Sequence, residues 1–531
     1  LSGGWFEPIC ISTMEFTVGL LLTFLVTFLI IALSVFYFYH TKDYNYWTNR
    51  GVPSIRPVFP FGSTRDLVLA KTFIGKGYNT MYQKFSKERF FGIIDVQNPV
   101  LVLRDPKLIK AVLVKDFNHF AVRTNVGANS KEYILRHVIN MNGQEWKDMR
   151  TLLTPAFTSG KMKSIFVLME KCSKQLNIYL HEAVGKNPVV EVTNVFARFT
   201  MDVIATSAFG VETDSINNEN CQFFTTMGSL LKTTKARFFR RFLVNFFPTL
   251  VKFLPVQLIP PEVTDLLTNS VRQSVHHREK NNIKRSDFLN VLIESKKCNG
   301  ENLEKSTSVS KPSKGLTIEE MTAQAFVFFI AGYTTDTSVM SFCLYELSIH
   351  ADIQEALYKN IQEAVEKHNG TITYESLQDM PYLDQVVNET LRLYGSGQII
   401  IRTCTERYNI PNTNIHVEKG VRVIIPSYSL HHDPVYFPDP DEFRPERFTP
   451  QKLKERHPFV FLPFGEGPRN CIGRNFGMLQ IKIGLATVIS NFKVDLSPEQ
   501  EVPINIDTRS IVVTPANPVL LRFTPRKMNG S

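Results

Sequence analysis

One cysteine near the end of the chain stands in surroundings that suit a metal ligand. Cys471 lies in the run Phe464 to Gly473, whose glycines allow a tight backbone turn beneath a flat ligand. The apolar run Phe476 to Ile489 predicts a buried helix directly after it. A helix N-terminus favours a thiolate over a thiol, because its N–H groups and dipole attract negative charge. No CxxC partner or nearby histidine is present, which disfavours zinc and iron–sulfur sites and favours haem.

The residues around Cys471 also form a recognisable pattern. Phe464, Gly467, Arg469, Cys471 and Gly473 fit F-x-x-G-x-R-x-C-x-G, and in this pattern the chain resembles the cytochrome P-450 family. The resemblance implies that Cys471 is the thiolate ligand of haem b (iron protoporphyrin IX), that the other four residues frame the cofactor, and that O2 is a co-substrate. The other six cysteines are predicted to be small buried hydrophobic residues.

Haem carries two propionates, which are costly to bury without cationic or N–H partners. Trp146 and Arg150 are four residues apart and should share one helix face, where an ordinary aromatic–cation pair would explain them equally well. The resemblance implies that this W-x-x-x-R pair holds a propionate. It assigns Arg123, Arg402 and Arg469 to the same task.

A long helix, buried on most sides, is predicted from Thr317 to about His350, with Thr317 and Glu320 forming a capping box at its start. Gly332 costs about 1 kcal/mol in such a helix, which indicates close approach by a ligand or a local kink. The segment around it resembles the family motif A-G-x-[D/E]-T, so Thr335 is implied in proton delivery to dioxygen. A threonine within a helix also commonly bonds back to a carbonyl one turn earlier.

The oxygen-side motif departs from the family pattern at one position. Thr334 stands where the family has an acidic residue, and the nearest acid is Asp336. Two residues correspond to about 200° around a helix, so Asp336 is expected to face away from Thr334. The route of proton delivery therefore remains open, with water as an alternative carrier.

A second pair of charged residues has a structural interpretation. Glu389 and Arg392 are three residues apart, and as an exposed pair they would contribute only a few tenths of a kcal/mol. The resemblance implies a buried pair instead, completed by Arg447 and holding the haem-side core. His431 and His432 are predicted to be turn and surface residues, not iron ligands.

Two features bear on the substrate. The loop Gly395 to Gly397 replaces a Pro-Pro turn that is common in the family, and its glycines predict greater flexibility beside the substrate pocket. Phe326, Phe328, Phe329 and Tyr333 predict an aromatic wall and a lipophilic substrate.

The N-terminal region predicts a membrane anchor. Phe16 to Tyr39 carries no charge, and as a helix it would rise about 36 Å, enough to cross a bilayer core of about 30 Å. Lys42, Arg50 and Arg56 follow this segment, so the positive-inside rule places the rest of the chain in the cytosol. A single-pass protein of the endoplasmic reticulum membrane is expected.

The expected fold is mainly α with a smaller β region (the cytochrome P-450 fold), preceded by one N-terminal transmembrane helix. Phe91 to Asp95 and Val100 to Leu103 predict a β-hairpin. The first methionine is Met14. The expected division is residues 1–13 as upstream or non-native sequence, 14–40 as transmembrane signal anchor, 41–62 as proline-rich hinge and 63–531 as haem-thiolate catalytic domain.

The net charge limits the classes of binding partner, and the cysteine content indicates the redox compartment. The 531 residues carry a formal net charge of +10, which fits an anionic membrane surface or an acidic protein, whereas the dispersed basic residues and absent motifs disfavour nucleic acid. Seven scattered cysteines suit a reducing compartment. Arg237 to Phe253 mixes arginine with aromatic residues, which fits either a core helix with a basic rim or a second membrane contact.

The resemblance implies a microsomal monooxygenase of xenobiotic metabolism, most similar to the insect detoxification branch, acting on lipophilic molecules. No G-x-G-x-x-G fingerprint is evident, so electrons should come from NADPH through a separate NADPH-cytochrome P-450 reductase, with cytochrome b5 as a further partner. Basic residues near the thiolate could form a docking face, or simply a solvated surface: Lys161, Lys163, Lys452, Lys454 and Arg474. Two alternatives remain open, namely a haem-thiolate isomerase or dehydratase acting on peroxides, and a non-catalytic membrane-tethered haem-binding protein.

Overall fold

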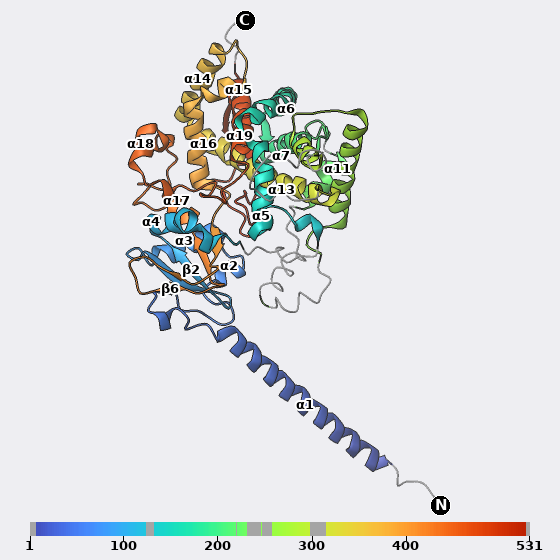
Figure 1. The fold of residues 1–531 in the computed structure, drawn as a ribbon, viewed down its shortest axis with the longest axis vertical. Coiled ribbons are helices and arrows are strands. Elements are labelled where there is room, and N and C mark those ends of the chain that lie inside the picture. The colour runs from blue at the N-terminus through green and yellow to red at the C-terminus, as the bar shows by residue number, and fades with distance from the viewer. Residues whose placement is uncertain are drawn as a thin grey trace, which may run out of the picture.

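Helices make up most of the chain and accompany a smaller β region, as predicted. The computed structural model describes residues 7–123, 132–218, 220–230, 246, 257–297 and 315–526. In Figure 1, helix α1 projects as a separate rod, the β region lies next to its inner end, and the C-terminus lies at the opposite end of the molecule. The segment Arg237 to Phe253, apart from Phe246, lies outside the described residues.

The helices have the following bounds: α1 Glu7–Thr41, α2 Arg65–Val68, α3 Ile74–Gln83, α4 Pro106–Lys110, α5 Gly143–Leu153, α6 Ser159–Lys186, α7 Val192–Ile204, α8 Gln222–Ser229, α11 Pro261–Asn281, α12 Phe288–Lys297, α13 Ile318–Ile349, α14 Ala351–Lys367, α15 Tyr374–Gln378, α16 Pro381–Tyr394, α17 Ser427–His431, α18 Pro450–Glu455 and α19 Arg474–Asn491.

Helix α1 has the length and composition of a membrane span. The segment Phe16–Thr41 has a mean hydropathy of 2.7, and its most apolar 18-residue stretch is not buried against the rest of the protein. The helix begins at Glu7, on the N-terminal side of the predicted anchor. Near its inner end, the rings of Phe36 and Tyr37 pack on Phe59 at 5.8 and 5.1 Å between centroids.

The predicted hairpin opens a four-stranded sheet with the order β1-β2-β7-β4. Strand β1 (Phe90–Asp95) pairs antiparallel with β2 (Asn98–Leu103), which confirms the prediction. Strand β7 (Arg422–Ile425) runs parallel to β2 and antiparallel to β4 (Ile400–Thr403). A second sheet contains β3 (Val189–Glu191), β9 (Leu520–Pro525) and β8 (Phe492–Leu496), and β5 (Tyr408–Asn409) pairs with β6 (His416–Val417).

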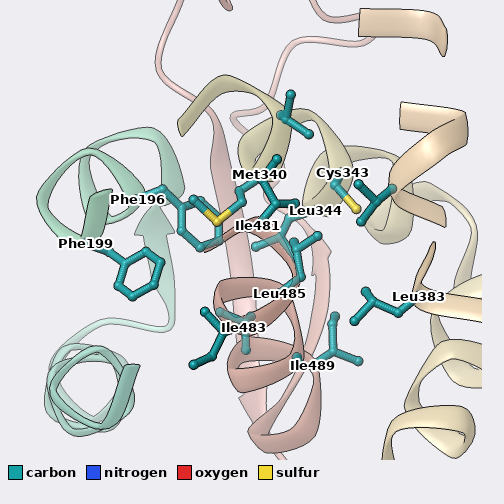
Figure 2. Packing of buried hydrophobic residues seen from close by; sticks show 14 of the residues in the cluster. Phe196, Phe199, Met340, Cys343, Leu344, Leu383, Ile481, Ile483, Leu485 and Ile489 are labelled. Atoms are coloured by element: carbon teal, nitrogen blue, oxygen red, sulfur yellow. The ribbon is translucent and has the colours of Figure 1, made fainter. Parts of the chain in front are cut away.

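Helix α13 lies in the largest hydrophobic core, as its apolar sequence predicts. The capping box at its start is confirmed, because the N–H of Thr317 donates to Glu320 at 2.8 Å and the N–H of Glu320 donates to the Thr317 hydroxyl at 3.2 Å. Figure 2 shows side chains of α13 meeting those of α7, α16 and α19 in this core. Helix α19 comes close at Gly484, where a Cβ atom would lie 2.6 Å from the Met340 sulfur.

The charged pair on α16 is buried, as the resemblance implies. Arg392 and Glu389 are fully buried with a closest distance of 2.8 Å, and Arg447 reaches Glu389 at 3.2 Å. Arg392 also donates to the backbone carbonyls of His431 and Pro440 at 3.0 and 2.7 Å. Removing one member of such a network would leave a buried charge without its partner and cost several kcal/mol.

The prediction that His431 and His432 lie at the surface is wrong. Both are buried, at 2% and 8% exposure, because α17 packs against α3 and α16. His431 Nε2 accepts a hydrogen bond from the N–H of Leu462 at 2.9 Å, which requires that nitrogen to be deprotonated. Burial lowers the pKa of His431 well below its usual value, in agreement with that role.

Candidate functional site

The loop before α19 folds into the tight turn that its glycines predict. Gly465 and Gly467 have positive φ values of 65° and 78°. A Cβ atom on Gly467 would overlap the backbone carbonyl of Leu113, so only glycine fits there. The N–H of Cys471 donates to the carbonyl of Phe464 at 2.8 Å and closes the loop, and Gly473 is the N-cap of α19.

Cys471 is accessible to solvent although protein atoms surround it closely. Burial raises the pKa of its thiol, and this outweighs the opposite effect of the Gly473 N–H and of Arg150 and Arg123. The helix terminus does favour the thiolate, as expected, but in the metal-free side chain burial has the larger effect on the pKa. A bound metal ion would reverse the balance, because coordination deprotonates a thiol.

Three of the other six cysteines are buried as predicted, and the side chains of Cys10 and Cys298 lie outside the described residues. Cys172, Cys343 and Cys404 are buried and Cys221 is half-buried. Among the described residues, these four cysteines are free thiols, as is Cys471.

Buried guanidinium groups with unpaired nitrogens gather near the cysteine loop. Arg402 on β4 is fully buried, and Arg469 in the loop is 3% exposed. Within the described ranges, Nε and Nη2 of Arg402 and Nε and Nη1 of Arg469 have no hydrogen-bond partner. Arg123 joins them by donating from Nη2 to the Arg469 carbonyl at 2.7 Å. Among the described residues, no carboxylate forms an ion pair with these three arginines.

Burial and mutual repulsion make this arginine cluster electrostatically costly. Burial, followed by the neighbouring charges of Arg123 and Arg469, lowers the pKa of Arg402 to about 8. Burial, followed by the neighbouring charges of Arg123 and Arg150, lowers the pKa of Arg469 to about 9. Burial lowers the pKa of Arg123 to about 10. An anion placed among them would relieve both the desolvation and the repulsion.

Helix α5 brings its predicted pair to the same region. The Trp146 ring lies under the Arg469 guanidinium, with 4.5 Å between Cζ and the ring centroid. Arg150 Nη2 donates to Asn470 Oδ1 at 2.8 Å, so this arginine steadies the cysteine loop. The sequence analysis did not include Asn470 among the site residues, although its position directly before Cys471 could have indicated a role in the cysteine loop. Asn142 was also missed, and its Oδ1 accepts from the Arg123 N–H at 3.0 Å.

One face of α13 is open in the middle of an otherwise buried helix. Ala331 is exposed, and Phe328, Gly332 and Thr335 are partly exposed. Residues 328, 331 and 335 share a helix face by their spacing, so free space borders α13 there. Ala331 was not singled out in the sequence. Thr335 donates to the Ala331 carbonyl, which confirms the backbone bond expected of a threonine within a helix.

The predicted aromatic wall is wrong for three of its four residues. Phe326, Phe329 and Tyr333 are buried at 1%, 0% and 6% exposure and belong to a hydrophobic core cluster. Only Phe328 retains partial exposure, and it packs edge-on against Phe288 at 3.8 Å between ring centroids. A run of aromatic residues on a helix covers several faces, and only the neighbouring elements decide which face stays open.

Asp336 is a buried carboxyl group with no cationic partner in the part of the chain that the structure describes. It is 6% exposed, its Oδ1 lies 3.2 Å from the Thr335 hydroxyl oxygen, and its Oδ2 has no partner among the described residues. The carboxyl lies against α19, where Gly477 leaves room for it: a Cβ on Gly477 would be 3.3 Å from Oδ1. Burial raises the pKa of Asp336 to about 7. The hydroxyl of Thr334 is also buried and unpartnered.

Comparison with known proteins places these features in a family. The family model of cytochrome P450 matches residues 59–523. The chain belongs to the cytochrome P450 family. It is 38% identical to cytochrome P450 6a8 of Drosophila melanogaster, over 91% of this chain and 95% of the relative. It is 36% identical to cytochrome P450 6j1 of Blattella germanica, over 95% of this chain and 98% of the relative.

Membership carries the reaction class with it. This P450 is an oxidoreductase of the monooxygenase type, with haem as cofactor and dioxygen as co-substrate. Its similarity to insect P450s agrees with the branch that the sequence indicates.

The residues present fit a haem. A flat ligand with two carboxylates needs a metal ligand on one side and several cationic donors at one edge. An accessible cysteine and four unpartnered guanidinium nitrogens of Arg402 and Arg469 meet this need in the described part of the P450. The open face of α13 at Ala331 supplies small side chains at the site.

Proposed function

We propose that this P450 is a membrane-bound haem-thiolate monooxygenase that inserts one oxygen atom of O2 into lipophilic substrates. Its electrons come from NADPH through a separate reductase. The observation that carries the proposal is the combination of one accessible cysteine with the buried, unpartnered guanidinium groups of Arg402 and Arg469. When bound, haem supplies the oxygen activation and C–H oxidation, with the second oxygen atom leaving as water.

Each predicted cofactor residue has a place in this proposal. Cys471 is the thiolate ligand, and Phe464 and Gly473 hold the loop around it. The propionates are bound by the unpaired guanidinium nitrogens of Arg402 and Arg469. Arg123, which donates to the Arg469 carbonyl, lies beside these nitrogens and binds the propionates with them. Trp146 supports the Arg469 guanidinium from below, and Arg150 fixes the loop through Asn470.

Thr335 and Asp336 form the proton-holding pair on the oxygen side. Asp336 keeps its proton up to about pH 7, and its Oδ1 is 3.2 Å from the Thr335 hydroxyl. The carboxyl can therefore supply a proton to Thr335 Oγ1 as that hydroxyl releases its own toward the open face of α13. This pair takes the place of the acidic residue that the family has at position 334. Gly332, which has no side chain, keeps the helix accessible beside the pair.

The membrane topology follows from α1. Its apolar segment Phe16–Thr41 anchors the chain in the endoplasmic reticulum membrane by a single pass, and Lys42, Arg50 and Arg56 keep the catalytic domain cytosolic. The hinge 41–62 then connects the anchor to the catalytic domain, 63–531. Phe59 packs on Phe36 and Tyr37, so the hinge lies at the membrane surface.

The reductase docks on the basic face near the cysteine loop, with cytochrome b5 as an alternative electron donor. Lys163 and Lys452 are already paired with Glu375 and Glu455. Lys161, Lys454 and Arg474 have no ion-pair partner among the described residues. These three are therefore the cations available to an acidic partner.

One comparison tests the proposed function against its alternatives. The purified full chain is assayed with reductase, NADPH and O2 on a panel of lipophilic substrates, and separately with a lipid hydroperoxide alone. NADPH-dependent oxygenated product supports the proposal. Turnover of the hydroperoxide alone would indicate an isomerase or dehydratase, and a haem-containing protein inactive in both assays would indicate a binding protein.

A further inference from the structure

Asn142 pairs with the backbone of Arg123 through its side-chain amide. Its Oδ1 accepts a hydrogen bond from the N–H of Arg123 at 3.0 Å, and its Nδ2 donates to the carbonyl of Arg123 at 3.1 Å. The amide thus satisfies both backbone groups of one residue, as a neighbouring strand would. Asn142 is the N-cap residue of α5, but its side chain forms no capping hydrogen bond. Its amide therefore serves Arg123 and not the start of the helix.

Strand β4 holds the residue before Arg123. The N–H of Thr403 donates to the carbonyl of Val122 at 2.9 Å. Thr403 directly follows Arg402 and is the last residue of β4. The segment that ends at Arg123 is therefore fixed both to the strand that carries Arg402 and to the start of α5.

The residue beside Asn142 contacts the third arginine of the cluster. The carbonyl of Met141 accepts a hydrogen bond from Nη2 of Arg469. In turn, Nη2 of Arg123 donates to the backbone carbonyl of Arg469 at 2.7 Å. The guanidinium groups of Arg123, Arg402 and Arg469 repel one another, so they stay together only if the backbone that carries them is held.

We propose that Asn142 is a positioning residue for haem binding: by pairing with the backbone of Arg123, it holds the Arg123 guanidinium beside Arg469, where a propionate binds. The inference rests on the proposed function, because it takes Arg123 as a partner of a propionate. Cations that are held in place before binding favour an anion more strongly, because they need not be brought together when it arrives.

Asn142→Ser separates this role from that of a helix cap. Serine is a favourable N-cap residue, because its hydroxyl can accept from an N–H in the first turn of the helix. Its single, shorter hydroxyl group cannot replace the amide that meets both the N–H and the carbonyl of Arg123. The variant should therefore keep α5 intact and release Arg123.

Gln354 offers a matched control. Its Oε1 accepts from the N–H of Val494 at 2.9 Å and its Nε2 donates to the carbonyl of Val494 at 2.7 Å, which is the same pairing with one backbone residue. This amide joins α14 to β8. Within the described residues, it forms no hydrogen bond with Arg123, Arg402 or Arg469. Gln354→Ser therefore removes an equivalent pair of hydrogen bonds away from the arginine cluster.

The test is a double-mutant cycle on the haem-loaded full chain, with haem release measured as transfer to an excess of an acceptor protein. Asn142→Ser should speed haem release by about threefold or more, because Arg123 is no longer held. In the Arg123→Leu background, where the guanidinium is already absent, adding Asn142→Ser should change the rate by less than about twofold. Gln354→Ser should release haem at the parental rate.

The inference is overturned if Asn142→Ser releases haem at the parental rate, if it speeds release by the same factor in the Arg123→Leu background, or if Gln354→Ser speeds release equally. Asn142→Gly, with another residue that helix N-caps tolerate, carries the same cycle if the serine variant fails to fold. Failure of the proposed function has a different signature: the parent protein itself would hold no haem, or would hold it and form no oxygenated product with NADPH and reductase.

Discussion

At the scale of single residues, the site is unusual for the polar groups that it buries without partners. Arg402 and Arg469 each leave two guanidinium nitrogens unsatisfied, and Asp336 leaves one carboxyl oxygen. Unsatisfied buried groups cost roughly 1–3 kcal/mol each in a folded protein. Because these groups gather near Cys471, the folded protein has an unfavourable electrostatic energy there. A bound ligand at the arginines and a proton at Asp336 would offset it.

Replacing Arg402 should stabilise the haem-free protein but speed the dissociation of haem from the haem-bound protein. Arg402→Leu removes a buried, repelled cation, so the haem-free protein should be more stable, by about 1–3 kcal/mol. The same change removes a propionate partner, so haem should dissociate at least about tenfold faster. Thermal unfolding of the haem-free protein and haem transfer to an acceptor protein measure the two effects.

Arg422→Leu serves as the control for this prediction. Arg422 lies on the neighbouring strand β7 and pairs with Asp95 at 2.7 Å at a partly exposed position. It should leave haem release unchanged. A destabilised haem-free Arg402→Leu protein with parental haem release would contradict the assigned role.

Asp336 should make stability depend on pH. The folded protein keeps the Asp336 proton up to about pH 7, whereas the ordinary pKa of an aspartate, which applies to the unfolded chain, is 3.8. The unfolded state therefore binds fewer protons between these values, and the free energy of unfolding falls as pH rises through them. Asp336→Asn removes this cost and should gain on the order of 4 kcal/mol relative to the parent above pH 7, and little near pH 4.

Unfolding midpoints of Asp336→Asn and the parent at several pH values measure the effect, with the exposed Asp441→Asn as control. Asp336→Asn should also lower the yield of product per NADPH several-fold, and adding Thr334→Glu should restore it by supplying an acid two residues earlier in the helix. A pH-independent stability difference, together with unchanged yield, would rule out a proton held at Asp336.

At the scale of elements, local patterns predicted the helices and turns but not their exposed faces. The capping box at Thr317 and the hairpin β1–β2 depend on neighbouring residues in the sequence, so they were predictable. The buried state of His431 depends on how α17 packs, and the burial of Phe326 depends on α13's neighbours. Likewise, the sequence could not reveal that Asn142 pairs with the backbone of Arg123, because only the folded chain brings the two segments together.

Close packing of α19 against α13 and α7 should be sensitive to one methyl group. Gly484→Ala would place Cβ 2.6 Å from the Met340 sulfur and 3.1 Å from the Phe199 ring. Since the methionine can shift but the ring is tightly packed, the expected loss of stability is about 1–3 kcal/mol. Gly185→Ala in α6 has no atom within 4 Å and should be neutral or stabilising by up to about 1 kcal/mol. Equal unfolding midpoints for the two variants would contradict this packing.

At the scale of the whole molecule, the fold brings four distant parts of the chain to one place. Arg123, helix α5, strand β4 and the loop before α19 supply the residues around Cys471, and α13 has an exposed face at Ala331. The buried network of Glu389, Arg392 and Arg447 connects α16 to the segment that precedes the cysteine loop. Helix α1 extends from the far side of the β region, away from the helical core (Figure 1).

The central claim is that this assembly holds a haem through the Cys471 thiolate. The most direct measurement is the absorption spectrum of the reduced carbon monoxide complex, compared between the parent protein and Cys471→Ala, with Cys221→Ala as a control. The account predicts a thiolate-type Soret band for the parent and for Cys221→Ala, and its complete loss in Cys471→Ala. A normal thiolate-type band in Cys471→Ala would contradict the account.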